Sequence, residues 1–485
     1  MQQYLLAVPV LLPLLGGLPV FKMKKRNTRR VYMWGLLILE MIVLMLIDWD
    51  GSKTLSIMQL WKGARIVLGA DSLGRLFAFL VSVLWLVVAV FADDYMTHEH
   101  SEARFFGFYV CSLGSLIGIC MAANLVTLYL FYEMMTLLTV FLVIHAGTSK
   151  AIDAGIKYLG FSICGAALGL LGMFHLQQFQ TTDLFVAGGT LAGGQSTALN
   201  IAMFLMLIGF GAKAGVMPLF AWLPTAHPVA PSPASAVMSG LITKMGVLAM
   251  IRVIYYQFGG DFFENSWMQT GMLCLAIFTV FMGSMLAYKE KTLKKRLAYS
   301  TVSQVSYILF GLFLISPDGF RGAMLQLVFH AIAKIGLFLA AGGVICHLHK
   351  TRVDHLQGAG KMLPVIMWGF GIYSLSLIGI PPVAGFVSKW FLAQGGLECG
   401  VLGFVGTAML MISALLTAGY LLPIVTDAFF PGEAFNFEEI RKNHKAKPSL
   451  YMTVPICVLA VSLVILGLFP GLLDDYIAPV MALLY

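Results

Sequence analysis

The stretch NLVTLYLFYEMMTLLTVFLVIH, residues 124–145, decides the fold class of this chain. It is almost wholly apolar, and it is long enough to cross a hydrocarbon layer of about 30 Å as an α-helix. One carboxylate, Glu133, lies in its middle half. A charge at the centre of a bilayer costs about 2.5–3.5 kcal/mol even on the most lenient insertion scale. The stretch therefore indicates a membrane-spanning helix whose single charge is turned away from lipid.

The rest of the chain repeats this pattern. Its 485 residues are 59% hydrophobic and 11% charged, whereas a soluble domain carries about 25% charged residues. A β-barrel would show short alternating segments instead of long apolar runs. We therefore predict an all-α polytopic membrane protein with fourteen spans, at residues 4–21, 31–47, 72–92, 105–122, 124–145, 155–176, 200–224, 234–257, 267–288, 298–316, 320–347, 363–391, 402–427 and 451–472.

Basic residues in the loops predict the orientation of these spans. The densest basic run, KMKKRNTRR at 22–30, should be cytoplasmic. Alternation then places three further basic loops inside, at 289–296, 348–362 and 428–450, the last with Arg441, Lys442, Lys445 and Lys447. The acid-rich loop ADDYMTHEHSEAR (92–104) is the one exception, because it is also assigned inside. We expect a multi-pass protein of the cytoplasmic membrane with both termini on the outer side.

Composition also bears on processing and cofactors. The first apolar stretch precedes its basic cluster and shows no small-residue cleavage site, so we expect a retained span and not a cleaved signal. The net charge of +8 lies in short loops and reports topology, not nucleic-acid binding. The seven cysteines show no CxxC or Cys/His metal spacing. We therefore expect no iron–sulfur cluster, zinc or haem in this chain.

Four lysines share the position of Glu133 inside apolar spans: Lys213, Lys244, Lys334 and Lys389. Five unpaired charges at this depth would cost on the order of 15 kcal/mol, comparable to the net stability of a domain. They are therefore expected to face protein or water inside a helix bundle, where intramembrane charges typically mark an ion path.

A polar stripe strengthens this interpretation. Gln326, His330 and Lys334 recur at intervals of four residues, which places them on one face of a helix. Histidine titrates near neutral pH, and a buried lysine can be tuned toward it, so this face suits a proton relay. Interhelical hydrogen bonding is the alternative interpretation of such a stripe.

Proline and glycine interrupt two spans close to buried lysines. In GFGAKAGVMPLFAWLPTAHPVAPSPASA (209–236), Pro218 removes a helix hydrogen bond near Lys213. In SLIGIPPVAGFVSKW (376–390), Pro381 and Pro382 precede Lys389. Broken helices at membrane depth line cavities or pack against protein, and paired breaks are typical of inverted repeats. A simple proline kink is the alternative.

Each relay candidate has a simpler interpretation beside the functional one. Glu133 is expected to form an ion pair with Lys213, although a neighbouring hydroxyl could satisfy it. Lys244 is followed by the uncharged run MGVLAMI (245–251) before Arg252, which disfavours snorkelling to the interface. Lys389 precedes Trp390, and this pair is equally consistent with an interfacial anchor.

Four further polar residues are expected outside the relay. Glu40 lies within the second span, where it is expected to pair with a neighbouring subunit. His227, between Pro224 and Pro228, is expected to be a loop residue near the inner mouth. Asp71 and Arg75 begin the third span and are expected to cap or pair instead of transporting ions.

Five motifs occur in the order found in one family: NLVTLYLFYEMMTLLTVFLVIH, KAGVMPLFAWLPTAHPVAPSPASAVMSGLITKMG, KRLAYSTVSQVSY, FHAIAKIGLFLAAGG and GIPPVAGFVSKW. Over about 105–427 the chain resembles the antiporter-like subunits shared by respiratory complex I, energy-converting hydrogenases and multisubunit Na⁺/H⁺ antiporters. Its length and its AHPVAPSPASAVMSG stretch are most similar to medium-length, hydrogenase-linked members.

The resemblance implies an architecture and a set of relay residues. Two inverted five-helix repeats would occupy 105–257 and 267–427, between a three-helix segment at 1–104 and a cytoplasmic loop with the last helix at 428–485. The implied proton relay comprises Glu133, Lys213, Lys244, His330, Lys334 and Lys389.

Three functions follow as expectations. The leading one is a proton-translocating subunit of a redox-driven membrane complex, of the complex I or energy-converting hydrogenase type. Iron–sulfur and other redox cofactors would lie on peripheral partner subunits, and related antiporter-like chains would be membrane neighbours. The alternatives are a subunit of a non-redox Na⁺/H⁺ antiporter, and a structural or quinone-binding membrane subunit.

Overall fold

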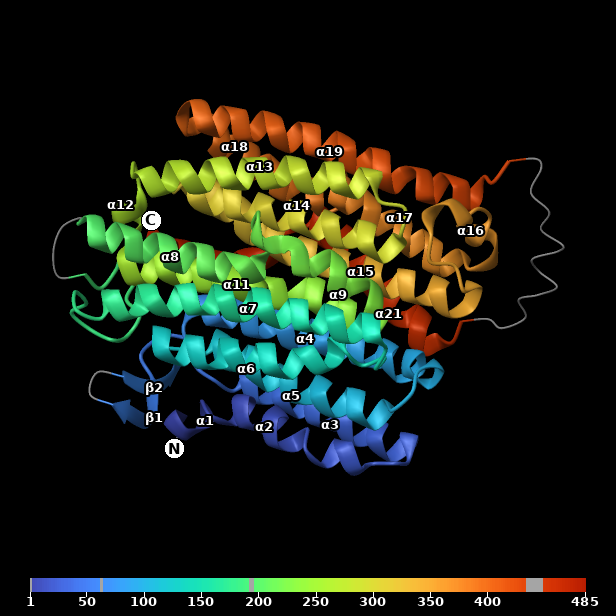
Figure 1. Ribbon diagram of the computed structural model, residues 1–485, viewed down its shortest axis with the longest axis horizontal. Helices are drawn as coiled ribbons and strands as arrows, with labels where there is room; N and C mark the ends of the chain where they lie inside the picture. Colours follow the sequence, from blue (N-terminus) through green and yellow to red (C-terminus); the bar gives the residue numbers. More distant parts are fainter. Residues whose placement is uncertain (1, 62–63, 192–195, 433–447) are drawn as a thin grey trace.

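The computed structural model describes residues 2–61, 64–191, 196–432 and 448–485 (Figure 1). Its helices run roughly along one direction, and both chain termini lie at the same end of the bundle (Figure 1). We call this end the termini end and the opposite one the loop end. Arg441, Lys442, Lys445 and Lys447, which were predicted in a basic loop, fall outside the described residues.

Eleven helical segments in the described ranges are long and apolar enough to cross a membrane, and each coincides with a predicted span. They are Gln3–Lys22 (most of α1, Gln2–Leu5; α2, Val8–Gly16; η1, Pro19–Lys22), Ser72–His98 (α4, Ser72–Tyr95; η2, Met96–His98), α5 (Glu102–Cys120), α6 (Leu125–Val143), α7 (Ser149–Leu176), Thr197–Val229 (α8, Thr197–Ala214; η3, Leu219–Trp222; α9, Leu223–Val229), Ser232–Phe258 (α10, Ser232–Val237; η4, Met238–Ile242; α11, Thr243–Ile251; η5, Arg252–Phe258), α13 (Trp267–Lys289), α15 (Pro317–Leu348), α19 (Gly400–Phe429) and α21 (Leu450–Leu468).

The other three predicted spans are also helical. They form α3 (Arg26–Met45), α14 (Leu293–Phe313) and the pair α17 (Pro364–Ile378) and α18 (Gly385–Glu398). The first two begin with the basic runs RNTRR and LKKR, which lower their mean hydropathy, and the third is divided by a break. Short helices complete the described chain: α12 (Gly260–Phe263), η6 (Val353–His355), α16 (Ala359–Met362), η7 (Pro470–Leu473) and α22 (Asp474–Leu484).

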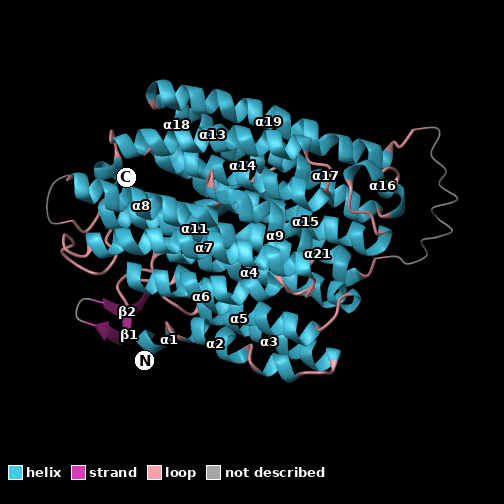
Figure 2. Cartoon of the chain, in the orientation of Figure 1, coloured by secondary structure: helices cyan, strands magenta, loops and turns pink. Residues whose placement is uncertain are grey.

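One small β-hairpin departs from the helical prediction. Strands β1 (Thr54–Trp61) and β2 (Ala64–Gly69) pair antiparallel at the termini end (Figure 2). The Gly69 amide donates to the Met121 carbonyl at 2.8 Å, and the Val67 amide donates to Thr127 Oγ1 at 2.8 Å. The hairpin is therefore fastened to the connection between α5 and α6.

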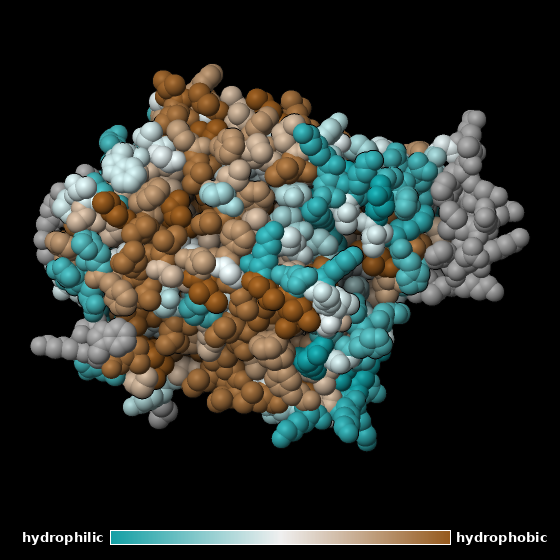
Figure 3. Space-filling model, viewed as in Figure 1, coloured by the Kyte–Doolittle hydropathy of each residue, from teal (hydrophilic) through white to brown (hydrophobic). Residues whose placement is uncertain are grey.

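The surface shows the expected membrane pattern. Figure 3 shows an apolar band across the middle of one face and polar residues gathered toward its ends. In the most apolar 18-residue stretch of Ser232–Phe258 all residues are buried, and in that of α15 94% are buried. In the corresponding stretches of α19 and α21 only 33% of the residues are buried. The two segments that carry Lys244 and Lys334 therefore lie in the centre of the bundle.

The acid-rich loop that broke the charge rule has a structural explanation. Arg26 and Arg30 both contact the carboxylate of Asp93, at 3.0 Å and 2.5 Å, and Arg29 pairs with Glu102. Acidic residues at this end thus neutralise the basic cluster that begins α3.

Both predicted breaks are confirmed, and they are built alike. Gly215 ends α8 with φ +86°, and Gly379 ends α17 with φ +91°. The amides of Gly215 and of the next residue both donate to the Gly211 carbonyl, and the amides of Gly379 and its successor both donate to that of Leu375. Such positive φ values suit glycine, which lacks a Cβ. The inverted repeats themselves stay a prediction.

Candidate functional site

Lys213 occupies a cage of hydroxyl groups. It lies in the last turn of α8, just before the first break, and its side chain is fully buried. Its Nζ donates to Thr136 Oγ1 of α6 and to Tyr158 OH and Ser162 Oγ of α7, each at 2.8 Å. These three bonds use all the N–H donors of an ammonium group.

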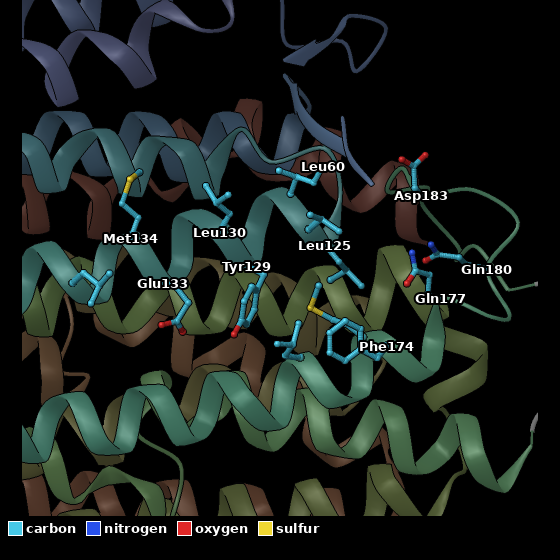
Figure 4. A pocket seen from close by; sticks show the side chains of 14 residues that line it. Leu60, Leu125, Tyr129, Leu130, Glu133, Met134, Phe174, Gln177, Gln180 and Asp183 are labelled. Atoms are coloured by element: carbon cyan, nitrogen blue, oxygen red, sulfur yellow. The ribbon is translucent and has the colours of Figure 1, made fainter. Parts of the chain in front are cut away.

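The predicted ion pair between Glu133 and Lys213 is wrong for this structure. Glu133 lies one turn before Thr136 on α6, and it is half-buried in a groove of about 510 Å³ between α6 and α7 (Figure 4). Its Oε1 has no hydrogen-bond partner among the described residues. Hydroxyls already saturate the ammonium, so the two charges interact only through space.

Figure 4 shows how this groove continues toward one end of α6 and α7. Its wall is made mostly of leucine, methionine and aromatic side chains, and Gln177, Gln180 and Asp183 lie at one end. Apart from the polar residues at that end, Glu133 is therefore the only carboxylate among the described residues that line the groove.

Lys244 is fully buried and does not snorkel to an interface. Its Nζ donates to the carbonyl oxygen of Ser239 at 2.7 Å, five residues earlier in the chain. Ser239 belongs to the π-helical turn η4, and π-helical turns are frequent at functional sites. The same carbonyl also accepts from Thr243 Oγ1 at 2.9 Å.

The predicted polar stripe on α15 does face the interior. Gln326, His330 and Lys334 are each at most 2% exposed. Lys334 Nζ donates to the Leu297 carbonyl of α14 at 3.0 Å. Both ring nitrogens of His330 are buried without a hydrogen-bond partner in the described part of the chain. This imidazole therefore retains two unused nitrogens one turn from a buried amine.

Gln326 connects the stripe to the second broken helix. Its Nε2 donates to Gln304 Oε1 of α14 at 2.8 Å, and its Oε1 accepts from Ser388 Oγ of α18 at 2.6 Å. Ser388 directly precedes Lys389 in the chain.

Lys389 points inward and is 5% exposed, whereas the neighbouring Trp390 is 55% exposed. Its Nζ donates to the last carbonyls of α17, those of Leu377 at 2.5 Å and Ile378 at 2.6 Å. A cation at a helix C-terminus is favoured by the helix dipole. The interfacial-anchor interpretation therefore applies to Trp390 and not to Lys389.

Two residues that sequence reasoning placed in loops belong to this interior. His227 was predicted near the inner mouth, but it lies in α9, fully buried, with its ring stacked on Phe338 of α15 at 4.8 Å. Neither of its ring nitrogens has a partner among the residues that the structure describes. The prolines around it suggested a loop, yet Pro224 fits the first turn of α9.

Lys294 is the second such residue. It lies in the first turn of α14, is 7% exposed, and donates to the Ala230 carbonyl at 2.8 Å. His227 lies within electrostatic reach of Lys294, Lys334 and Lys244. A lysine in the run KEKTLKKR gives no sign of burial in the sequence, because its burial involves a contact of α14 with the chain after α9.

Glycines bring the helices that carry the buried lysines close together. A Cβ added at Gly246, two residues after Lys244, would lie 3.1 Å from the Cβ of Lys213. One added at Gly240 would lie 2.4 Å from Ile335, the residue after Lys334. The segment that carries Lys244 is therefore in direct contact with the helix of Lys213 and with that of Lys334.

The remaining polar residues are placed as follows. Glu40 is fully buried and accepts from Ser82 Oγ of α4 at 3.0 Å, so the expected pairing with a neighbouring subunit is wrong. Asp71 caps α4 by accepting from the Gly74 amide, and it pairs with Arg252 at 2.5 Å, as expected. The described residues contain no group of three or more His, Cys, Asp or Glu side chains that could hold a metal ion.

Comparisons with known sequences identify the family of this chain. Residues 122–417 match the family described as "NADH:quinone oxidoreductase/Mrp antiporter, TM". The chain is 32% identical over 419 residues to an NADH-quinone oxidoreductase subunit of Desulforudis audaxviator, covering 83% of this chain and 82% of that protein. It is 28% identical over 482 residues to a Na⁺/H⁺ antiporter subunit of Bacillus subtilis, covering 97% and 94%. It is 33% identical over 347 residues to Hydrogenase-4 component B of Escherichia coli, covering 68% of this chain and 51% of that protein.

Solved structures show the same fold. A chain of the Mrp complex from Dietzia sp. DQ12-45-1b superposes with a TM-score of 0.86 at 24% identity, covering 100% of this chain and 97% of that one. A chain of respiratory complex I from Thermus thermophilus gives 0.84 at 21% identity, covering 99% and 100%. From the family match and the identity to the oxidoreductase subunit, the chain belongs to the antiporter-like transmembrane family that complex I, Mrp antiporters and hydrogenases share.

Proposed function

We propose that this chain moves protons across the membrane along a buried path of Lys244, His330, Lys334 and Lys389, and that Glu133 and Lys213 gate this path. The central observation is that the Lys244 and Lys334 amines are buried against backbone carbonyls, near imidazoles with unused nitrogens. Burying a charge without a counter-charge is costly, which favours passing the proton to a neighbouring acceptor.

The path has a direction in this proposal. Protons enter from the loop end, which the basic loops assign to the cytoplasm, beside Lys294 and His227. They pass Lys244 and Lys334, and then follow Gln326 and Ser388 to Lys389. From Lys389 they leave toward the other side. Changes in the charge of Glu133 alter the Lys213 amine through space and so gate the path.

We propose a redox-driven complex as the setting. The identity to an NADH-quinone oxidoreductase subunit over 83% of this chain supports it. Redox centres would lie on partner subunits, and related antiporter-like chains would flank this one in the membrane. Moving one charge against 100 mV takes about 2.3 kcal/mol, a load that electron transfer can supply. The hydrogenase relative matches over only 51% of its own length, so it gives less support to the hydrogenase type.

A non-redox Na⁺/H⁺ antiporter is the second candidate, because one specific observation favours it. The antiporter protein of Bacillus subtilis aligns over 97% of this chain and 94% of its own length. The same lysine path would carry protons there. Sodium prefers oxygen ligands, so the sodium path would lie in another subunit.

The test is proton uptake by the purified complex in sealed vesicles. Lys334→Met should abolish uptake while the complex still assembles. The matched control is Lys150→Met, at an exposed lysine, which should leave uptake unchanged. Full uptake by an assembled Lys334→Met complex would refute the relay. Co-purified iron–sulfur subunits would support the redox setting, and sodium-dependent uptake without them would support the antiporter.

A further inference from the structure

A second apolar groove, of about 260 Å³, lies away from the lysine path. Helices α4 and α21 form its walls, for example with Leu76, Val83 and Val458. Val328 and Ile332 of α15 lie at its base and are at most 6% exposed, and Tyr476 of α22 lines its rim. Among the described residues that α4, α15 and α21 contribute to the lining, Ser462 carries the only hydroxyl, and it donates to the Leu459 carbonyl at 2.8 Å.

The length of the groove limits what can occupy it. Its lining on α4 runs from Leu76 to Val87, and at about 1.5 Å per residue this is about 16 Å. That distance is about half of a hydrocarbon core of about 30 Å. A transmembrane helix of a partner would need the whole thickness, whereas one acyl chain of a lipid in a single leaflet spans half of it.

A cation, Arg75, lies next to two residues of the groove lining, Leu76 and Tyr476. Arg75 directly precedes Leu76 in the first turn of α4, and its guanidinium lies 4.9 Å from the centre of the Tyr476 ring. Its Nε is buried without a partner, and within the described ranges it forms no ion pair. Two carboxylates of these helix ends are engaged with other arginines, since Asp71 pairs with Arg252 and Asp474 with Arg321.

Aromatic residues mark this level of the molecule. The Phe79 ring lies 6.2 Å from that of Trp49 and 6.1 Å from that of Tyr476. Tryptophan and tyrosine are enriched at the membrane–water interface, where lipid headgroups lie. The first turn of a helix also favours anions through its dipole.

We propose that this groove binds an anionic phospholipid, with its phosphate on Arg75 and one acyl chain between α4 and α21. The inference depends on the membrane-spanning fold and is independent of the proposed proton path. Lipid in this groove would nevertheless lie close to that path, because Val328 and Ile332 lie two residues before and two residues after His330 on α15. A bound acyl chain packs against the back of the helix that carries His330 and Lys334.

The headgroup contact is tested by titrating the purified full-length protein with phosphatidylglycerol in detergent and counting bound lipids by native mass spectrometry. Arg75→Gln should weaken binding about tenfold or more, because a charge-assisted contact is lost. Arg65→Gln is the matched control, since Arg65 lies in β2 and pairs with Asp183 at 2.6 Å. It should bind as the unmodified protein does. Arg75→Lys, which keeps the charge, should retain most of the binding.

The groove itself is tested on α21. Val458→Phe fills the groove, whereas Val461→Phe places the same ring on an exposed surface outside its lining. Only Val458→Phe should abolish lipid binding.

Equal affinity for phosphatidylcholine, or equal binding by the Arg75→Gln and Arg65→Gln proteins, would overturn the headgroup contact. Unchanged binding by Val458→Phe, or a cross-link from Ser462→Cys to another subunit, would overturn the acyl-chain occupant. A thermal-unfolding midpoint for each variant separates lost binding from lost folding.

Discussion

At the scale of single residues, the buried lysines are held by dipoles and not by carboxylates. Three hydroxyls surround the amine of Lys213, and two carbonyls at a helix end hold that of Lys389. An amine bound to neutral oxygens can release its proton without leaving a buried carboxylate behind unpaired. In the proposed path, His227 and His330 would be the matching proton acceptors, because their ring nitrogens have no hydrogen-bond partner among the described residues.

His227→Phe tests the role of the histidine that sequence reasoning missed. Phenylalanine retains a ring to stack on Phe338 but has no nitrogen to carry a proton. Proton uptake by the reconstituted complex should fall by on the order of tenfold or more, as for loss of a proton-transfer group. The thermal-unfolding midpoint should change little. His355→Phe, at an exposed position in the short helix η6, is the control, and equal uptake by both variants would remove His227 from the path.

At the scale of elements, the two broken helices create the sites that continuous helices could not. Each break frees the carbonyls of the last turn before it, and Lys389 uses those of Leu377 and Ile378. Glycine is required where the break begins, because the backbone there has a positive φ and little room for a side chain. The second break thus places an amine and an exposed helix end side by side.

Gly379→Ala should damage the second break. The new Cβ would meet the Lys389 Cδ at 2.7 Å, in a left-handed conformation that costs a non-glycine residue about 1–2 kcal/mol. We expect a lower thermal-unfolding midpoint and reduced proton uptake, since Lys389 must move. Gly271→Ala in α13, where a Cβ meets nothing within 4 Å, should be neutral or slightly stabilising. If both variants unfold at the same temperature, the break does not need glycine.

At the scale of the whole molecule, charge is sorted between the two ends of the bundle. The termini and the hairpin lie at one end, and the basic cluster of α3 meets acidic residues at the other (Figure 1). Because both chain termini lie at the same end of the bundle, we expect them to share one side of the membrane. The positive loops predict that this shared side is the outer one.

Labelling of intact cells with a membrane-impermeant maleimide tests the orientation. In a protein whose native cysteines are replaced by alanine, Asp475→Cys at the termini end should react in intact cells. Lys361→Cys, in α16 at the loop end, should react only after the membrane is permeabilised. The reverse pattern would show that the termini face the cytoplasm and would invert the proposed direction of transport.

The sequence by itself determined the membrane spans, the two breaks and which charged residues lie in apolar helices. These properties are local, because about twenty residues set whether a helix crosses a bilayer, and glycine and proline interrupt the backbone where they occur. The small hairpin escaped prediction, since its attachment to the α5–α6 connection is a contact between distant segments.

Only the tertiary structure decided what each charge touches. Lys213 and Thr136 are 77 residues apart, and the rotation of α6 about its axis sets whether Thr136 or Glu133 faces the amine. His227 of α9 likewise stacks on Phe338 of α15, and Glu40 of α3 accepts a hydrogen bond from Ser82 of α4. These contacts depend on how the helices pack against each other. Helix packing in turn depends on side chains that are far apart in the chain, and local hydropathy does not encode those contacts.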